Sequence, residues 1–297
     1  MRLGILGYGE AGQAIAASMA ETAIEKNRSL SLIAYDHLYQ TKAACDEADV
    51  SQAAQLEPSL AELAKQSDII ISVVTADESL NAIIALLPYL SSHHHIADGN
   101  SVSPGTKRKA EALLQDIGAS YSDMAIMAPI HPRGHKTPML LAGPEKGTLA
   151  DMLDDFGFDY SWEGASVGDA SVVKMLRSVL IKGMECLISE SVTASQSLGL
   201  DTRILQSAGK TLGISDMAGL ADYVMERAGT HGRRRAAEMR EVAKTLAELG
   251  LSHDMSSAIA QYQDRIADMN LVAEFDGVLP RDRAKLAEAM RKAQKTL

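Results

Sequence analysis

The stretch LGILGYGEAGQAIA, residues 3–16, decides the fold of the first half of the chain. An apolar run over residues 2–6 leads into the turn Gly7-Tyr8-Gly9-Glu10-Ala11-Gly12, and an alanine-rich helical pattern follows over 10–23. Glycines at the first, third and sixth positions between a strand and a helix form the pattern that binds a pyrophosphate. They permit the tight turn, let a phosphate reach the backbone, and let the helix pack closely on the strand.

A carboxylate closes the next predicted strand, residues 29–36, at Asp36, which lies 24 positions after Gly12. Such a carboxylate accepts hydrogen bonds from the adenosine ribose and repels a 2′-phosphate. His37 and Leu38 follow it, so no adjacent arginine is available to hold that phosphate. We therefore expect NAD as the cofactor, with NADP still possible and a glycine-rich bend without a ligand as the alternative. The expected cofactor-binding residues are Gly7, Tyr8, Gly9, Glu10, Ala11, Gly12, Asp36, Val74, Thr75 and Asn100.

Strand and helix patterns alternate over the first 160 residues. Continuous apolar runs bounded by polar residues are typical of parallel strands covered on both faces. Helical patterns lie between them, and Ser103-Pro104 is a helix-start signal. This alternation predicts an α/β Rossmann-type domain with a mostly parallel sheet. Besides 2–6 and 29–36, the predicted strands are 67–75, 94–100, 119–126 and 138–144, and the further helices are 77–88 and 104–117.

The pattern changes near residue 165. One long helical segment runs from Gly168 to about Leu198, and only helical patterns follow it, at 201–212, 217–228, 231–249, 254–268 and 281–296. We therefore predict an all-α C-terminal domain, joined to the first domain by a long interdomain helix. The predicted domains are 1–163, which binds NAD(P), and 164–297, which serves substrate binding and dimerisation.

Composition excludes several classes of function. The net charge of −10 argues against nucleic acid or an anionic membrane as a partner, because either needs a broad basic face. No apolar run reaches the length of about 18 residues that a membrane span requires. The N-terminus does not resemble a signal peptide, and Cys45 and Cys186 lack metal-ligand spacing, so we expect a cytoplasmic protein with free thiols.

Three motifs, taken in order, resemble the β-hydroxyacid dehydrogenase superfamily, which includes 3-hydroxyisobutyrate dehydrogenase and, more distantly, 6-phosphogluconate dehydrogenase. They are the N-terminal glycine turn, the turn Asp98-Gly99-Asn100-Ser101 before Ser103-Pro104, and a lysine early in the long helix, Lys174. The segment KMLRSVLIKGMECL resembles a less characterised branch with a divergent helical domain. The resemblance implies that Asn100 and Ser101 bind substrate and nicotinamide, and that the helical domains pair into a homodimer.

The resemblance also implies that Lys174 transfers a proton to or from the substrate oxygen during hydride transfer. A free lysine has a pKa of about 10.4, so a base at neutral pH needs burial or a neighbouring cation, and Arg177 is three positions away. Ser178 and Lys182 follow on the same helical stripe. We expect Ser178 to assist catalysis and Lys182 to bind substrate. The alternative is a solvated helix face.

Three departures from the family pattern leave the substrate open. Ser178 stands where the family has Asn, and Asn100 stands where Ser is usual, so an amide is expected to donate in place of a hydroxyl. Met127-Ala128-Pro129 replaces the paired glycines after the sixth strand, and Pro129 lacks an N–H donor. The carboxylate end of the usual substrate is then bound differently, or the substrate is larger.

The remaining motifs are weaker. HHH (93–95) and HPRGH (131–135) lack the geometry of a metal site, so we expect no metal. One arginine of the basic run 230–242, Arg235 in our prediction, is expected to bind an anionic group of the substrate. Together these features predict an NAD(P)-dependent dehydrogenase of a small hydroxy acid. An imine reductase on the same scaffold and a non-catalytic dinucleotide sensor are the alternatives.

Overall fold

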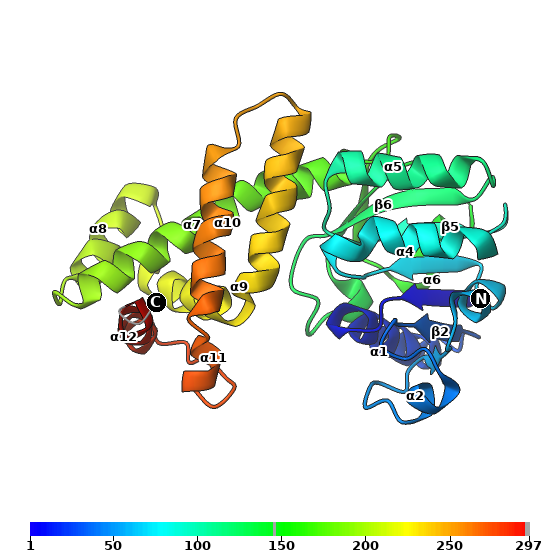
Figure 1. The fold of residues 1–297 in the computed structure, drawn as a ribbon, viewed down its shortest axis with the longest axis horizontal. Helices are drawn as coiled ribbons and strands as arrows, with labels where there is room; N and C mark the ends of the chain where they lie inside the picture. The colour runs from blue at the N-terminus through cyan, green and yellow to red at the C-terminus, as the bar shows by residue number, and fades with distance from the viewer. Residues whose placement is uncertain (145–146, 295–297) are drawn as a thin grey trace. The chain divides into compact units, whose positions relative to one another are not determined.

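The protein is described here from a computed structural model, in which residues 1–144 and 147–294 are placed (Figure 1). The chain forms two compact units, Met1–Met175 and Leu176–Leu297, which meet within the long helix α7 (Asp169–Gln196).

The first unit contains one eight-stranded sheet with the strand order β3-β2-β1-β4-β5-β6-β7-β8. Neighbouring strands are parallel except β6 and β7, which are antiparallel. The order reverses between β1 and β4, which is the switch point where doubly wound sheets bind ligands. The strands are β1 (Arg2–Leu6), β2 (Ser31–Tyr35), β3 (Gln55–Leu56), β4 (Ile69–Ser72), β5 (His95–Asp98), β6 (Ser120–Ile126), β7 (Met139–Ala142) and β8 (Tyr160–Gly164).

Helices cover both faces of this sheet, which explains why the central strands read as continuous apolar runs. One face packs against α1 (Glu10–Glu25) and α6 (Thr148–Phe156), around Ile5, Ile15 and Leu153. The other packs against α3 (Leu60–Lys65), α4 (Ser79–Leu86) and α5 (Pro104–Gln115), around Ile70, Ile83 and Leu114. A short helix, α2 (Lys42–Asp46), follows β2.

The described residues of the second unit form helices joined by turns and loops, with no strand among them. Its apolar core joins α7 to the helices that follow, with Val192, Met225 and Leu286 among the buried side chains. These helices are α8 (Asp201–Leu212), α9 (Met217–Glu248), α10 (Asp254–Asp268), α11 (Leu271–Glu274) and α12 (Arg283–Gln294). None of the described helices is long and apolar enough to cross a membrane.

The predicted fold class is confirmed. The strands at 2–6 and the helices at 201–212 and 254–268 have the predicted bounds, and the other predicted elements end within a few residues of theirs. The helices predicted at 217–228 and 231–249 form the single run α9, which departs from helical geometry at His231. The two units meet later than the predicted boundary at 163/164, because Ala170 and Ser171 of α7 contact the sheet at Ala125 and Asp123.

Several elements were not predicted. Three of them, β3, α2 and α11, are too short for a periodic pattern. Two others, α3 and α6, lie in segments for which we predict no helix. β8 alternates between half-buried and exposed residues at the edge of the sheet, so it lacks the apolar run of the central strands. The antiparallel direction of β7 also escaped prediction, because a short apolar run carries no information on strand direction.

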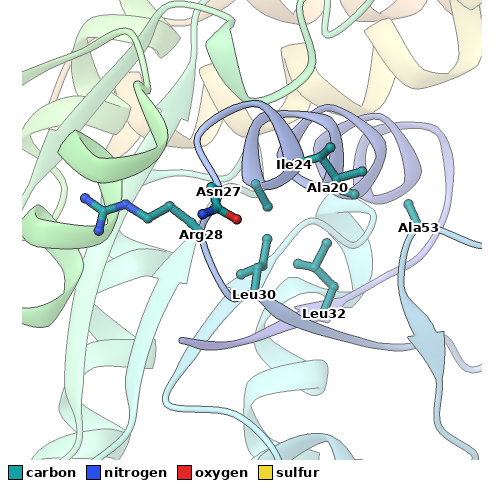
Figure 2. A pocket seen from close by; sticks show the side chains of 8 residues that line it. Ala20, Ile24, Asn27, Arg28, Leu30, Leu32 and Ala53 are labelled. Atoms are coloured by element: carbon teal, nitrogen blue, oxygen red, sulfur yellow. The ribbon is translucent and has the colours of Figure 1, made fainter.

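A shallow hollow lies beside the end of α1 and the start of β2 (Figure 2). It is at the amino ends of the strands, whereas the glycine turn follows the carboxyl end of β1. The hollow is therefore separate from the expected cofactor site. Its lining consists of Ala20, Ala23, Ile24, Asn27, Arg28, Leu30, Leu32 and Ala53.

Buried His95 makes the stability of the first unit depend on pH. Its Nε2 lies 2.8 Å from Ser122 Oγ, and burial lowers its pKa from 6.5 to about 4. Because the unfolded chain binds the proton more readily, stability falls as pH drops from about 6.5 towards 4. We expect a loss of about 1–2 kcal/mol between pH 7 and 5, measured by urea unfolding.

The variant His95→Asn should lose this part of the pH dependence, and His93→Asn, which changes an exposed histidine, should retain it. An unchanged pH dependence in His95→Asn would contradict the assignment.

Candidate active site

Polar and glycine residues gather where β1, β2, β4 and β5 end. Because these strands are parallel neighbours, their carboxyl ends lie along one edge of the sheet. The glycine turn follows β1 and Asp36 follows β2, while Val74 and Thr75 follow β4 and Asn100 follows β5. The structure thus brings the predicted cofactor residues to one edge.

The glycine turn has the geometry that a pyrophosphate requires. Gly7 has a φ of +94°, and a Cβ there would lie 2.9 Å from the Val73 carbonyl oxygen. A Cβ on Gly12 would overlap the Gly7 carbonyl oxygen. Gly9, by contrast, is the N-cap of α1 and has open space where a Cβ would stand. Of the three glycines in this turn, Gly9 is the one that packing does not require. The absence of a side chain at Gly9 leaves a cradle for a phosphate above Glu10 and Ala11, at the positive end of the helix.

Asp36 is held in place by the glycine turn. Its Oδ2 accepts from the Tyr8 N–H at 2.8 Å and its Oδ1 from the Leu38 N–H at 3.1 Å. The Tyr8 ring is buried, and its hydroxyl donates to the Ser51 carbonyl at 2.9 Å. Tyr8 therefore shapes the turn through its backbone and packing, and its side chain is a structural anchor.

Asn100 joins three elements at the end of β5. Its side-chain amide donates to Ser72 Oγ at 2.9 Å and to Ser79 Oγ at 3.2 Å, and its N–H donates to Asp98 Oδ1 at 2.8 Å. This corrects the expectation that Asn100 donates to substrate, because both serines already use the amide. The enclosed Asn100 Oδ1 has no hydrogen-bond partner, so this turn can accept one more donor.

Lys174 reaches the same turn from the first part of α7. Its Nζ donates to Ser101 Oγ at 2.6 Å, and the side chain is partly buried. The two residues are 73 positions apart in sequence. The contact places an ammonium group beside a hydroxyl at the carboxyl edge of β5, next to the expected cofactor residues.

A buried ionic network lies beneath this turn, and we did not predict it. The Lys107 ammonium is fully buried, 2.9 Å from Asp98 Oδ1 and 3.5 Å from Asp123 Oδ1. The Tyr121 hydroxyl donates to Asp98 Oδ2 at 2.5 Å, and burial, together with Asp98, raises the Tyr121 pKa well above 10. In the sequence, Lys107 stands beside Arg108 and Lys109 and resembles an exposed helix face.

The remaining predicted substrate residues are paired with carboxylates of the second unit. Lys182 Nζ lies 2.8 Å from Glu238 Oε2 and donates to Ser178 Oγ at 3.1 Å. The buried Arg235 guanidinium pairs with Glu185. The pairs 182/238 and 185/235 both link α7 to α9. Arg235 is therefore a link between helices and is already paired with a carboxylate, which argues against its predicted role in binding an anionic group of the substrate.

The histidine motifs are structural. His135 is buried, with its ring nitrogens 2.7 Å from Ser18 Oγ and 2.9 Å from the Phe156 carbonyl, and burial lowers its pKa. His94 lies 3.0 Å from the Ala64 carbonyl. Within residues 1–144 and 147–294, no group of three or more His, Cys, Asp or Glu side chains could hold a metal ion.

Comparisons with known proteins agree with this geometry. The model for the NAD binding domain of 6-phosphogluconate dehydrogenase matches residues 2–146, and a domain of unknown function, DUF1932, matches residues 195–266. An uncharacterised 28.5 kDa protein of Methanothermus fervidus is 30% identical over 194 residues, which cover 65% of this chain and 72% of that protein.

Solved structures share the whole fold. A conserved hypothetical protein from Sinorhizobium meliloti is 29% identical with a TM-score of 0.72, over 98% of this chain and 96% of that one. The 3-hydroxyisobutyrate dehydrogenase of Mycobacterium tuberculosis is 15% identical with a TM-score of 0.69, over 98% and 99%. An imine reductase from Pseudomonas sp. is 17% identical with a TM-score of 0.55, over 97% and 98%.

The fold and the glycine turn define the first unit as an NAD-binding domain of the Rossmann type. The chain belongs to the β-hydroxyacid dehydrogenase superfamily. Solved structures named 3-hydroxyisobutyrate dehydrogenase and imine reductase share its fold.

Glycine variants test the cofactor cradle. Gly9→Ala should leave the thermal midpoint nearly unchanged, because the added methyl meets no protein atom, yet it should weaken NADH binding at least about tenfold by occupying the phosphate space. Intrinsic fluorescence titration with NADH measures the affinity. Gly12→Ala is the contrasting variant and should destabilise the fold itself, since its methyl overlaps Gly7. Wild-type NADH affinity in Gly9→Ala would contradict the placement of the pyrophosphate.

Proposed function

We propose that this protein is an NAD-dependent dehydrogenase that interconverts an alcohol and a carbonyl on a small hydroxy acid, with Lys174 as the general acid and base. The observation that carries the proposal is the 2.6 Å contact between Lys174 Nζ and Ser101 Oγ. It joins Lys174, the residue of α7 that we expect to transfer the proton, to the turn at the end of β5. Residues that fit the cofactor line the same edge.

The chain's own residues have distinct tasks in this reaction. A bound nicotinamide supplies the hydride acceptor or donor. Lys174, as the neutral amine, accepts the hydroxyl proton of the substrate during oxidation and returns it to the carbonyl oxygen during reduction. Ser101 keeps the amine at the edge of the sheet and offers a hydroxyl to the same substrate oxygen. Each oxidation therefore releases one proton to water when Lys174 is deprotonated again.

The cofactor preference follows from Asp36. Its carboxylate is fixed by two backbone N–H groups and stays close to the glycine turn, where the adenosine ribose would lie. A 2′-phosphate would meet this negative charge. We therefore favour NAD over NADP for this chain.

The carboxylate end of the substrate is bound differently from that of the better known family members. The segment Met127-Ala128-Pro129 replaces paired glycines, and the Met127 N–H already donates to the Pro138 carbonyl at 2.9 Å. Fewer backbone donors are then available for a carboxylate. An imine reductase is the second candidate because such enzymes share the fold. A lysine beside Ser101 favours alcohol chemistry, since it supplies the proton that a carbonyl oxygen needs.

We also propose that α7 pairs with α7 of a second copy to form a homodimer. Leu176, Leu180 and Leu187 are exposed on one stripe of this helix, with 41%, 70% and 63% of their surface accessible. An antiparallel pairing about a two-fold axis beside residues 183–184 sets Leu180 against Leu187. The apolar stripe is therefore self-complementary about this axis.

Replacing Lys174 tests the reaction. Lys174→Met should lower turnover by at least about a hundredfold, because the proton donor and acceptor is gone, while NADH affinity changes less than about twofold. A panel of hydroxy acids is assayed with NAD and with NADP by the absorbance of the reduced nicotinamide. It finds the substrate and measures turnover. Lys109→Met, an exposed lysine of α5, is the control. Undiminished turnover would refute the proposal, and binding without any turnover in the wild type would favour a sensor.

Charge and apolar variants test the dimer. Leu180→Glu should produce monomers in light scattering after size exclusion, because it places two carboxylates against apolar residues, whereas Leu198→Glu, an exposed leucine outside the stripe, should not. A monomeric wild type, or a dimer indifferent to Leu180→Glu, would contradict the pairing.

A further inference from the structure

Asp98 and Asp123 are adjacent on the neighbouring strands β5 and β6, where the register pairs them directly. Both side chains are buried, and one ammonium, that of Lys107, serves both. Lys107 Nζ also donates to the Asp98 carbonyl oxygen at 2.5 Å. Two carboxylates with one cation leave the cluster one negative charge in excess, so each carboxylate needs further donors.

Besides the Tyr121 hydroxyl, which donates to Asp98, the further donors come from the two segments that meet in the Lys174–Ser101 contact. Asp98 accepts from the N–H of Asn100, the residue before Ser101. Asp123 accepts from Ser171 twice, from its N–H at 2.8 Å and from its Oγ at 2.6 Å. Ser171 lies in the first turn of α7, where a negative charge is favoured by the helix dipole.

The contacts therefore form a closed circuit. It runs from the 100–101 turn through Asp98, Lys107 and Asp123 to Ser171, and returns through Lys174 to Ser101. Since Lys174 follows Ser171 by three residues, fixing the first turn of α7 also fixes where the Lys174 side chain starts. A buried ion cluster does not by itself show that the cluster stabilises the fold, because apolar residues of similar volume can often replace it without loss of stability.

We propose that Asp123 is a positioning residue, which holds the first turn of α7 through Ser171 so that the Lys174 amine stays at the substrate turn. This inference rests on the proposed function of Lys174. Asp123 contacts neither the turn 100–101 nor the amine in any bond described above, so its action passes through Ser171 and through Lys107.

Ser171→Ala tests this role, because it removes one bond to Asp123 and leaves every charge of the network in place. Trace labelling with acetic anhydride, followed by peptide mass spectrometry, gives the reactivity of Lys174 relative to exposed Lys210 of the same molecule. We expect this ratio to rise about fivefold in Ser171→Ala, the factor for one lost hydrogen bond, and to stay within about twofold of wild type in Ser171→Thr, which restores the hydroxyl.

Ser189→Ala is the matched control, since it removes another buried serine hydroxyl of α7, one that donates to the Glu185 carbonyl at 2.7 Å. Its labelling ratio should not change. Asp123→Asn is the second variant and should also raise the ratio. Unchanged labelling of Lys174 in Ser171→Ala and Asp123→Asn, or an equal rise in Ser189→Ala, would overturn the proposal.

Turnover provides the second readout. On a substrate found by the panel, kcat of Ser171→Ala should fall about tenfold to a hundredfold, with NADH affinity unchanged and KM moving less than kcat. The two proposals fail separately. Full turnover in Lys174→Met would refute the role of the lysine, whereas unchanged labelling in Ser171→Ala would refute only the role of Asp123.

Discussion

The hydrogen bond between Lys174 and Ser101 is the interaction on which the functional interpretation depends. It connects a helix and a strand turn that are far apart in sequence, and it does so at the edge where four parallel strands end. Parallel strands make this possible because each of them delivers the residues after it to the same edge. The glycine turn, Asp36 and the turn 98–101 are therefore neighbours, whatever the lengths of the segments between them.

Much of this arrangement could be predicted from the sequence, because the decisive signals are local. Each of these signals can be recognised within a few residues of sequence. They include a glycine that needs a φ of +94°, a serine-proline helix start and a continuous apolar strand. The order of these signals predicts a mostly parallel sheet and the cofactor-binding residues that follow its strands. The resemblance to a family then identified which lysine of α7 to consider.

The rest could not be predicted because it depends on partners that are distant in sequence. Lys107 looks like a surface lysine until Asp98 and Asp123 are seen on either side of its ammonium. Arg235 looked free to bind an anion because Glu185, 50 positions away, carries no mark of being its partner. Asn100 was expected to donate to substrate, yet Ser72 and Ser79 already accept from its amide. In each case the sequence shows a charged group or a hydrogen-bond donor, but it does not show which distant residue pairs with that group in the fold.

The most direct measurement of the central claim is chemical rescue of Lys174→Ala by small primary amines. If Lys174 transfers the proton, added methylamine or ethylamine should restore part of the lost turnover, with rates that depend on the pKa of the amine as a Brønsted relation requires. Tertiary amines too bulky for the vacated space should not. Turnover that stays low with every amine, or that was never lost, would contradict a proton-transfer role for this residue.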